Sequence, residues 1–176
     1  MHAEASSLSK TRIPPPLFPR RNAIVQEYIG HPPGLYTRMA LTGRLHPLLV
    51  HFPIALILGA AAAELVSVAT RLPEWHAVAV ANLRVGAAFA VASAGAGWLL
   101  ASSRIVEASP ALEWHRWLGL MAAFAALGAA LTTVQSGRRS RRLRMYRLVL
   151  FSAAASVAVA GHFGAVLVWG ADFLRP

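Results

Sequence analysis

The sequence predicts an all-α integral membrane protein, a four-helix bundle with up-and-down topology. Hydrophobic residues make up 56% of the chain and charged residues only 14%, and this composition is typical of a protein that spans a lipid bilayer. The apolar residues gather in four runs of about 20 residues, the length at which a helix crosses the hydrocarbon core. None of the runs alternates polar with apolar residues as barrel strands do, so helices are the expected spanning elements.

Four spans and a preceding tail account for the chain. Residues 1–44 are basic, contain several prolines and hold no apolar run, so we predict that they form a disordered tail. Translation from Met39 would remove most of this tail. The transmembrane domain is expected over residues 45–176, with spans at 47–69, 83–102, 117–134 and 148–169.

The formal net charge of +10 is concentrated where it predicts membrane orientation. The connection between the third and fourth spans, residues 135–147, carries six arginines, and such loops stay in the cytoplasm. This puts residues 71–84 inside, and residues 104–116 and both termini outside. A real basic tail would oppose this bias and favour the opposite orientation. In a membrane protein such a run contacts anionic lipid, so we expect the lipid bilayer, and no nucleic acid, as a partner.

Four histidines fall in or beside the spans, and the up-and-down order brings them toward the same, outer end. They are His46, His51, His115 and His162. From the helix rise, His162 lies about 22 Å from the inner boundary and His51 about 7 Å deeper than His46, so His51 and His162 share a level. Because successive helical residues turn by about 100°, His46 and His51 are expected to point in different directions.

The imidazoles favour a bound metal or haem. The chain has no cysteine, so nitrogen or oxygen must supply any protein ligand. Haem iron takes two axial imidazoles from facing helices, so the leading hypothesis is a b-type haem that passes electrons near the outer face. His51 and His162 are its expected axial pair, while His46 and His115 are second candidates, or partners for the propionates or a quinone.

Two other hypotheses remain open on the same residues. Zinc or copper held by three or four imidazoles would serve transport or sensing, provided that the side chains converge within a few ångströms. Alternatively, the chain is a structural or accessory subunit of a respiratory membrane complex, with its histidines bonded to backbone or lipid. No catalytic residue is assigned, and catalysis by the chain alone has little support. The sequence leaves the oligomeric state open.

Other features concern helix packing. Glu64 is the one carboxylate inside a span and Arg84 opens the next span near the same membrane face, so a structural charge pair is expected between them. Pro53 either bends the first span just beyond His51 or lies where its helix begins. Stripes of small residues in the spans permit close helix packing and equally leave room for a porphyrin.

Three short motifs resemble those of a known family. They are HPLLVHFPIAL at residues 46–56, His115 ahead of the third span, and GHFG at residues 161–164 ahead of Trp169 and Gly170. Over residues 45–173 the chain resembles the bacterial family of predicted membrane proteins catalogued as domain of unknown function 2231. The resemblance implies four spans in a bacterial inner membrane, with the histidines at motif positions, and it implies no established activity.

Overall fold

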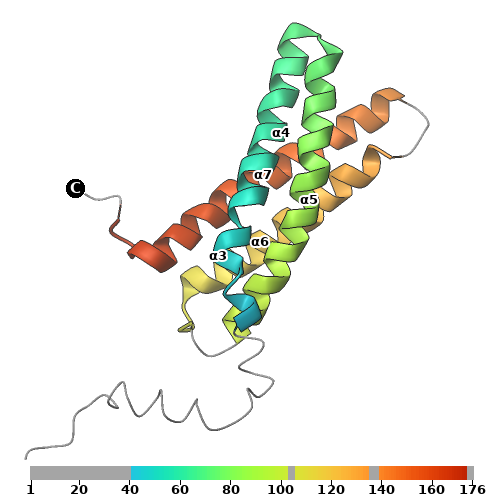
Figure 1. Ribbon diagram of the computed structural model, residues 1–176. Coiled ribbons are helices and arrows are strands. Elements are labelled where there is room, and N and C mark those ends of the chain that lie inside the picture. The colour runs from blue at the N-terminus through green and yellow to red at the C-terminus, as the bar shows by residue number, and fades with distance from the viewer. Residues whose placement is uncertain (1–40, 103–105, 135–138, 174–176) are drawn as a thin grey trace, which may run out of the picture. The chain divides into compact units, whose positions relative to one another are not determined.

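The computed structural model describes residues 41–102, 106–134 and 139–173, and within them it contains helices and no strand. A short helix, α3 (His46–Leu49), precedes four long ones: α4 (His51–Thr70), α5 (Pro73–Ser102), α6 (Pro110–Thr132) and α7 (Arg139–Trp169). Figure 1 shows the long helices running alternately up and down. The predicted all-α fold is confirmed. The predicted tail as far as residue 40, and the Met39 start with it, lie outside the described residues.

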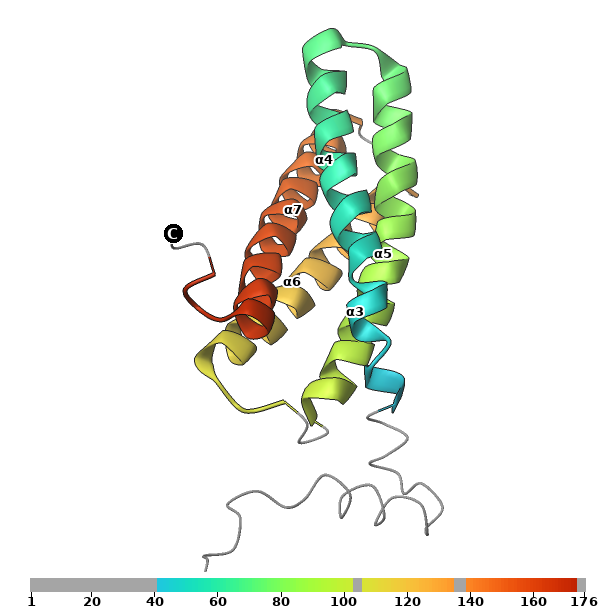
Figure 2. The same cartoon turned by 60° about the vertical axis from the view of Figure 1, so that its left-hand side comes forward.

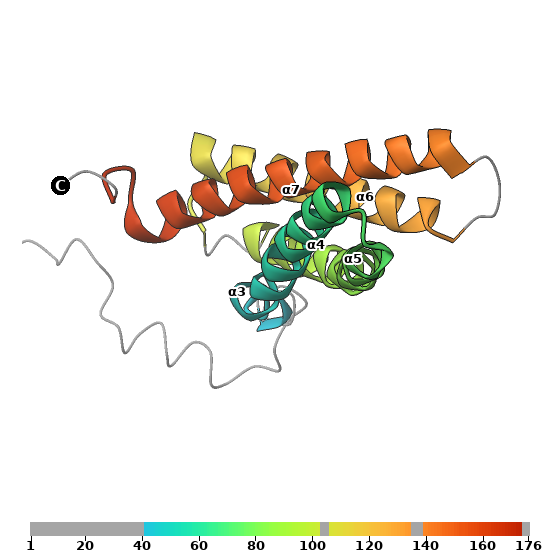
Figure 3. The same ribbon diagram turned by 90° about the horizontal axis from the view of Figure 1, so that it is seen from above.

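Each long helix packs against two neighbours. α4 contacts α5, α5 contacts α6, α6 contacts α7, and α7 completes the ring by contacting α4. The α4–α5 hairpin crosses the α6–α7 hairpin obliquely, as Figures 2 and 3 show. We name the two ends of this bundle by their side chains. The histidine end holds His46 and His115, and the arginine end holds Arg84 and Arg147.

Three helical segments are long and apolar enough to cross a membrane. They are Leu41–Thr70, which takes in α3 and α4, together with Pro73–Ser102 and Ser140–Trp169. The fourth helix, α6, is 23 residues long, enough for a core of about 30 Å. Charged and polar side chains in its first two turns, such as Glu113 and Arg116, lower its hydropathy, and it is not among the three.

The core of the bundle is built mainly from small side chains, with Ile57, Leu83 and Leu150 as fully buried larger ones, and many large apolar side chains face outward. Phe124 is 67% exposed and Leu148 is 63% exposed. Helices in lipid associate through small residues, because lipid solvates leucine and phenylalanine as well as a protein core does. This distribution is the one expected of a protein surrounded by a bilayer. Alanines are the most frequent of the fully buried residues: Ala60, Ala79, Ala126, Ala129 and Ala153.

The helices extend beyond the predicted spans at the arginine end. α5 begins at Pro73 rather than at residue 83, and α7 begins at Arg139 rather than at residue 148. α4 and α5 are joined by a tight turn in which Arg71 adopts a left-handed backbone (φ 60°) and its N–H donates to the Ser67 carbonyl at 2.9 Å. Hydropathy marks where a helix enters lipid, so it missed these polar first turns.

The first span contains one interruption. α3 and α4 are separated by Val50, which keeps helical dihedral angles (φ −62°, ψ −26°). Pro53 has no N–H to donate to the Leu49 carbonyl, so the helical hydrogen bonding is broken at this point. The two helices therefore form a nearly continuous segment, with His46 on one side of the break and His51 on the other.

The two hairpins repeat one another. An offset of 69 residues places His46 on His115 and the sequence LGAA at 58–61 on LGAA at 127–130. An offset of 67 residues places α5 on α7 and matches Leu83 with Leu150, both fully buried. Since α4 contacts α7 as α5 contacts α6, the hairpins are related by an approximate twofold axis. Further matched positions are buried in both hairpins: Ile57 with Ala126, Ala60 with Ala129, Ala79 with Tyr146, and Ala90 with Val157.

Candidate functional site

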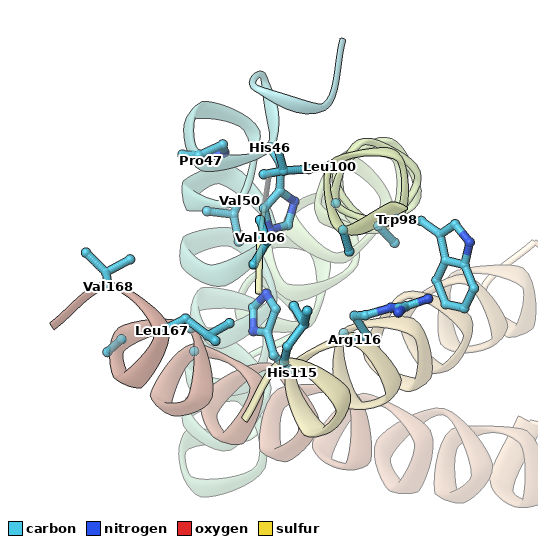
Figure 4. Close-up of a pocket in the computed structure, with 18 of the residues that line it drawn as sticks. His46, Pro47, Val50, Trp98, Leu100, Val106, His115, Arg116, Leu167 and Val168 are labelled. Carbon is cyan, nitrogen blue, oxygen red and sulfur yellow. The ribbon is translucent and has the colours of Figure 1, made fainter. Parts of the chain in front are cut away.

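The histidine end contains a cavity of about 450 Å³ between the helices. Its walls are mainly apolar, and His46, His51, His115 and Arg116 are among the side chains that line it. Figure 4 shows the imidazoles of His46 and His115 pointing toward one another from opposite sides of this cavity. Small-molecule sites in proteins are commonly apolar clefts of about 300–1,000 Å³ with a few convergent polar groups. The cavity has both properties.

His46 is held by the backbone of α5. Its Nδ1 lies 2.8 Å from the Ser93 carbonyl oxygen and 3.2 Å from the Ser93 hydroxyl oxygen. A carbonyl only accepts hydrogen bonds, so Nδ1 carries the proton and donates it. The neutral ring then has its lone pair on Nε2. The short helix α3 positions this ring, because His46 is its first residue.

His115 repeats this arrangement on the other hairpin. Its Nδ1 lies 2.8 Å from the Ala160 carbonyl oxygen of α7, so it too carries the proton and leaves Nε2 with the lone pair. The two acceptors, Ser93 and Ala160, are related by the 67-residue offset of the repeat. Both imidazoles are therefore oriented by equivalent backbone groups.

Each imidazole also packs against a glycine of the helix that holds it. A Cβ built on Gly97 would lie 2.8 Å from His46 Nδ1, and a Cβ on Gly164 would lie 3.1 Å from His115 Cε1. These glycines are again 67 residues apart. Two of the small residues in the predicted stripes thus leave room for imidazole rings.

The two rings lie close together, each from its own hairpin. Their centroids are 5.8 Å apart and their planes are inclined at 79°. Two imidazoles that bind one metal ion through Nε2 on opposite sides, at about 2 Å each, have centroids roughly 6 Å apart. The observed separation fits this requirement.

The other two predicted histidines are placed differently. His51 lines the cavity but is exposed. His162 is exposed, does not line the cavity, and contacts Phe163 and Phe173 with ring centroids 5.7 and 6.0 Å away. The structure therefore brings together His46 and His115 rather than the predicted axial pair His51 and His162. The predicted pair was chosen because both residues lie at a similar depth in the membrane. Which imidazoles lie close together depends instead on the direction in which each ring faces.

The described residues contain no group of three or more His, Cys, Asp or Glu side chains that could hold a metal ion. Two imidazoles leave two of the four positions of a tetrahedral zinc or copper site without a protein ligand. A haem needs only two, because the porphyrin supplies four nitrogens of its own.

A second polar cluster lies at the arginine end around Glu64, which has no exposed surface. Its Oε1 accepts a hydrogen bond from Arg147 Nε at 2.7 Å, and its Oε2 lies 2.7 Å from His76 Nδ1. The Tyr146 ring packs edge-on against His76, with centroids 5.3 Å apart. The cluster joins α4, α5 and α7, and its hydrogen bonds offset the burial of the carboxylate.

The predicted pairing of Glu64 with Arg84 was wrong in its partner. Arg84 instead donates from Nε to the Thr133 hydroxyl at 3.1 Å and from Nη2 to the Thr133 carbonyl at 3.3 Å, so it binds the end of α6. His76 was not among the residues predicted from the sequence, because residues 71–84 were expected to form a loop. Arg147 was interpreted only as a topology signal. The repeat, which pairs His46 with His115, is the signal that would have identified the facing imidazoles.

Comparison with known proteins supports the membrane assignment. No curated protein and no solved structure matches the chain. The model of one family of predicted membrane proteins, domain of unknown function 2231, matches residues 43–173 and covers all five described helices. The chain therefore belongs to this family of predicted membrane proteins.

Proposed function

We propose that this membrane protein binds a b-type haem between His46 and His115 and passes electrons near one face of the bilayer. The observation that carries the proposal is the pair of facing imidazoles, 5.8 Å apart, with each Nδ1 bonded to a backbone carbonyl. Such bonds fix the tautomer and ring orientation of a metal-binding histidine and raise its basicity. They leave Nε2 of each ring as the atom that would hold the iron.

The residues around the pair suit this role. A bound haem would supply a one-electron redox couple. The apolar walls of the cavity, among them Val50, Ile54 and Leu120, would exclude water and control the polarity around the iron. Gly97 and Gly164 let both imidazoles approach their supporting helices closely.

The side of the membrane on which electrons would be exchanged follows from the charge of the helix ends. α7 begins with arginines, including Arg141, Arg144 and Arg147, and arginine-rich ends remain in the cytoplasm. We therefore place the protein in a bacterial inner membrane with its histidine end toward the periplasm. A quinone or a respiratory-chain protein on that side is the proposed redox partner.

One observation favours a second candidate, a structural or accessory subunit. Each imidazole bonds the backbone of a neighbouring helix and so can act as a clamp within its hairpin. In that case neither Nε2 needs a ligand. Removal of both imidazoles would then lower stability without changing any bound cofactor.

A visible difference spectrum separates these candidates. The full-length protein, expressed with added haem and extracted in detergent, is expected to show the reduced-minus-oxidised bands of a b-type cytochrome. His46→Ala and His115→Ala should abolish these bands, whereas His162→Ala, on the same end of the bundle but outside the cavity, should keep them. A wild-type protein without haem absorption contradicts the proposal. If the bands are lost in His51→Ala and His162→Ala but kept in His46→Ala and His115→Ala, then His51 and His162 are the axial ligands.

A further inference from the structure

Two pairs of matched positions in the cavity differ in chemistry between the hairpins. The 69-residue offset that matches His46 with His115 also matches Pro47 with Arg116 and His51 with Leu120. All six residues line the cavity. The imidazoles are thus equivalent, but only the His115 side carries a permanent positive charge.

Arg116 is held in place by a tryptophan. Its Cζ lies 4.1 Å from the centroid of the Trp98 ring, and Trp98 in turn packs edge-on against Trp117 at 6.2 Å. Figure 4 shows Arg116 and Trp98 together on one side of the two imidazoles. A guanidinium that stacks on an aromatic ring keeps its N–H donors free at its edges.

The ion pairs found among the described residues do not include Arg116. The two ion pairs within that part of the chain both involve Glu64, at the opposite end of the bundle. Glu113, one turn before Arg116 on α6, takes part in neither. Arg116 therefore presents an oriented cation at the edge of an apolar cavity.

We infer that Arg116, supported by Trp98, binds a carboxylate of the ligand in this cavity and so fixes the orientation of that ligand. The inference rests on the proposed function. Haem carries two carboxylates on one edge of its ring, and arginine binds carboxylates through paired N–H donors. Two axial imidazoles alone would not fix how the haem is turned about the line between them, and a carboxylate bound to Arg116 would fix that rotation.

The test compares haem with its dimethyl ester, in which both carboxylates are neutral esters. We expect the full-length wild-type protein in detergent to bind haem roughly tenfold or more tightly than the ester, as measured by titration of the visible absorption. Arg116→Gln should lose most of this preference while keeping the spectrum of two axial imidazoles. Arg141→Gln, an exposed arginine at the other end of the bundle, is the matched control and should retain the full preference.

The outcomes separate this inference from the proposed function. Equal binding of haem and ester by the wild-type protein overturns the inference and leaves haem binding intact. The same holds if Arg116→Gln keeps the full preference, as expected if Arg116 serves only a lipid headgroup. Absence of binding to either compound removes the proposed function and the inference with it. The wild-type comparison alone remains decisive if the Arg116→Gln protein fails to fold.

Discussion

At the scale of single residues, each imidazole of the candidate site is fixed by one hydrogen bond and one glycine. The carbonyl oxygens of Ser93 and Ala160 accept hydrogen bonds from the Nδ1–H groups of the two rings. Gly97 and Gly164 allow the rings to lie against the helices. In each neutral ring Nε2 then carries the lone pair and is the atom that would hold the metal of the proposed site.

Substitution of Gly97 tests this close fit. Gly97→Ala should displace the His46 ring, because the new Cβ would lie 2.8 Å from its Nδ1, and we expect a loss of about 1–3 kcal/mol in the free energy of unfolding. Gly95→Ala is the matched control on the same helix, since a Cβ there has no neighbour within 4 Å. The control should be neutral or stabilising by up to about 1 kcal/mol, because alanine favours helix. Denaturation in detergent, followed by circular dichroism, measures both. Equal stability of the two variants would show that the imidazole does not occupy this position.

A double-mutant cycle tests which arginine supports Glu64. Glu64→Gln and Arg147→Gln should be coupled by more than about 0.5 kcal/mol in unfolding free energy, because the two side chains are directly bonded at 2.7 Å. Glu64→Gln and Arg84→Gln should add to within about 0.5 kcal/mol, since Arg84 bonds Thr133 instead. The reverse pattern of coupling would reinstate the pair expected from sequence.

At the scale of elements, α6 depends on its cap to begin where it does. The Ser109 hydroxyl accepts a hydrogen bond from the Leu112 N–H at 3.2 Å, and Pro110 follows as the first helical residue. Such a cap satisfies a backbone donor that has no partner within the helix. It fixes the first turns of α6 and so the starting point of the segment that carries His115.

Loss of this cap should weaken α6. Ser109→Ala is expected to lower the unfolding free energy by about 1 kcal/mol, and Ser109→Asp should preserve it, because aspartate caps equally well. Ser102→Ala is the control: its hydroxyl donates to the Trp98 carbonyl at the end of α5, and we expect a change within about 0.5 kcal/mol. Thermal unfolding of the three variants in detergent decides the matter. A destabilised Ser109→Asp protein would contradict the capping role.

The sequence predicted the presence and order of the four long helices, because membrane-spanning runs are set by composition alone. It did not predict their polar starts. Pro73 and Arg139 begin α5 and α7 well before the apolar runs, since a helical hairpin continues through the interface, where water solvates polar side chains. Glu64 was recognised as a buried carboxylate, but its partner depended on this extension, which brings His76 into the first turn of α5.

The candidate site was predicted less completely than the fold. The sequence singled out four histidines as candidate ligands, and two of them, His46 and His115, form the facing pair. Depth along the helix axis could not reveal which two histidines face one another. The direction of each ring depends on the rotation of its helix and on the break between α3 and α4. The repeat of His46 at His115, with equivalent glycines at 97 and 164, contains this information in the sequence itself.

At the scale of the whole molecule, the distribution of charge makes a prediction about orientation. The chain has no cysteine, so single cysteines can be labelled without background. A membrane-impermeant thiol reagent added to intact cells should label Glu107→Cys, in the exposed connection between α5 and α6, and not Arg141→Cys, at the start of α7. Permeabilised cells provide the control in which both are labelled. Exclusive labelling of Arg141→Cys would reverse the orientation.

The twofold relation of the hairpins gives the molecule one site shared by both halves. His46 comes from the first hairpin and His115 from the second, and each is oriented by the partner helix of its own hairpin. A ligand between them would therefore join the two hairpins, and its binding would stabilise the folded bundle. Arg116 and His51, which have no counterparts of like chemistry in the other half, distinguish the two sides of that site.

Electron paramagnetic resonance of the oxidised, haem-supplemented protein tests most directly whether both imidazoles bind the same iron. We predict a low-spin ferric signal of two axial nitrogens in the wild-type protein, lost in His46→Ala and in His115→Ala and retained in His162→Ala. A high-spin signal in the wild-type protein, or a low-spin signal that survives both alanine substitutions, would contradict this prediction.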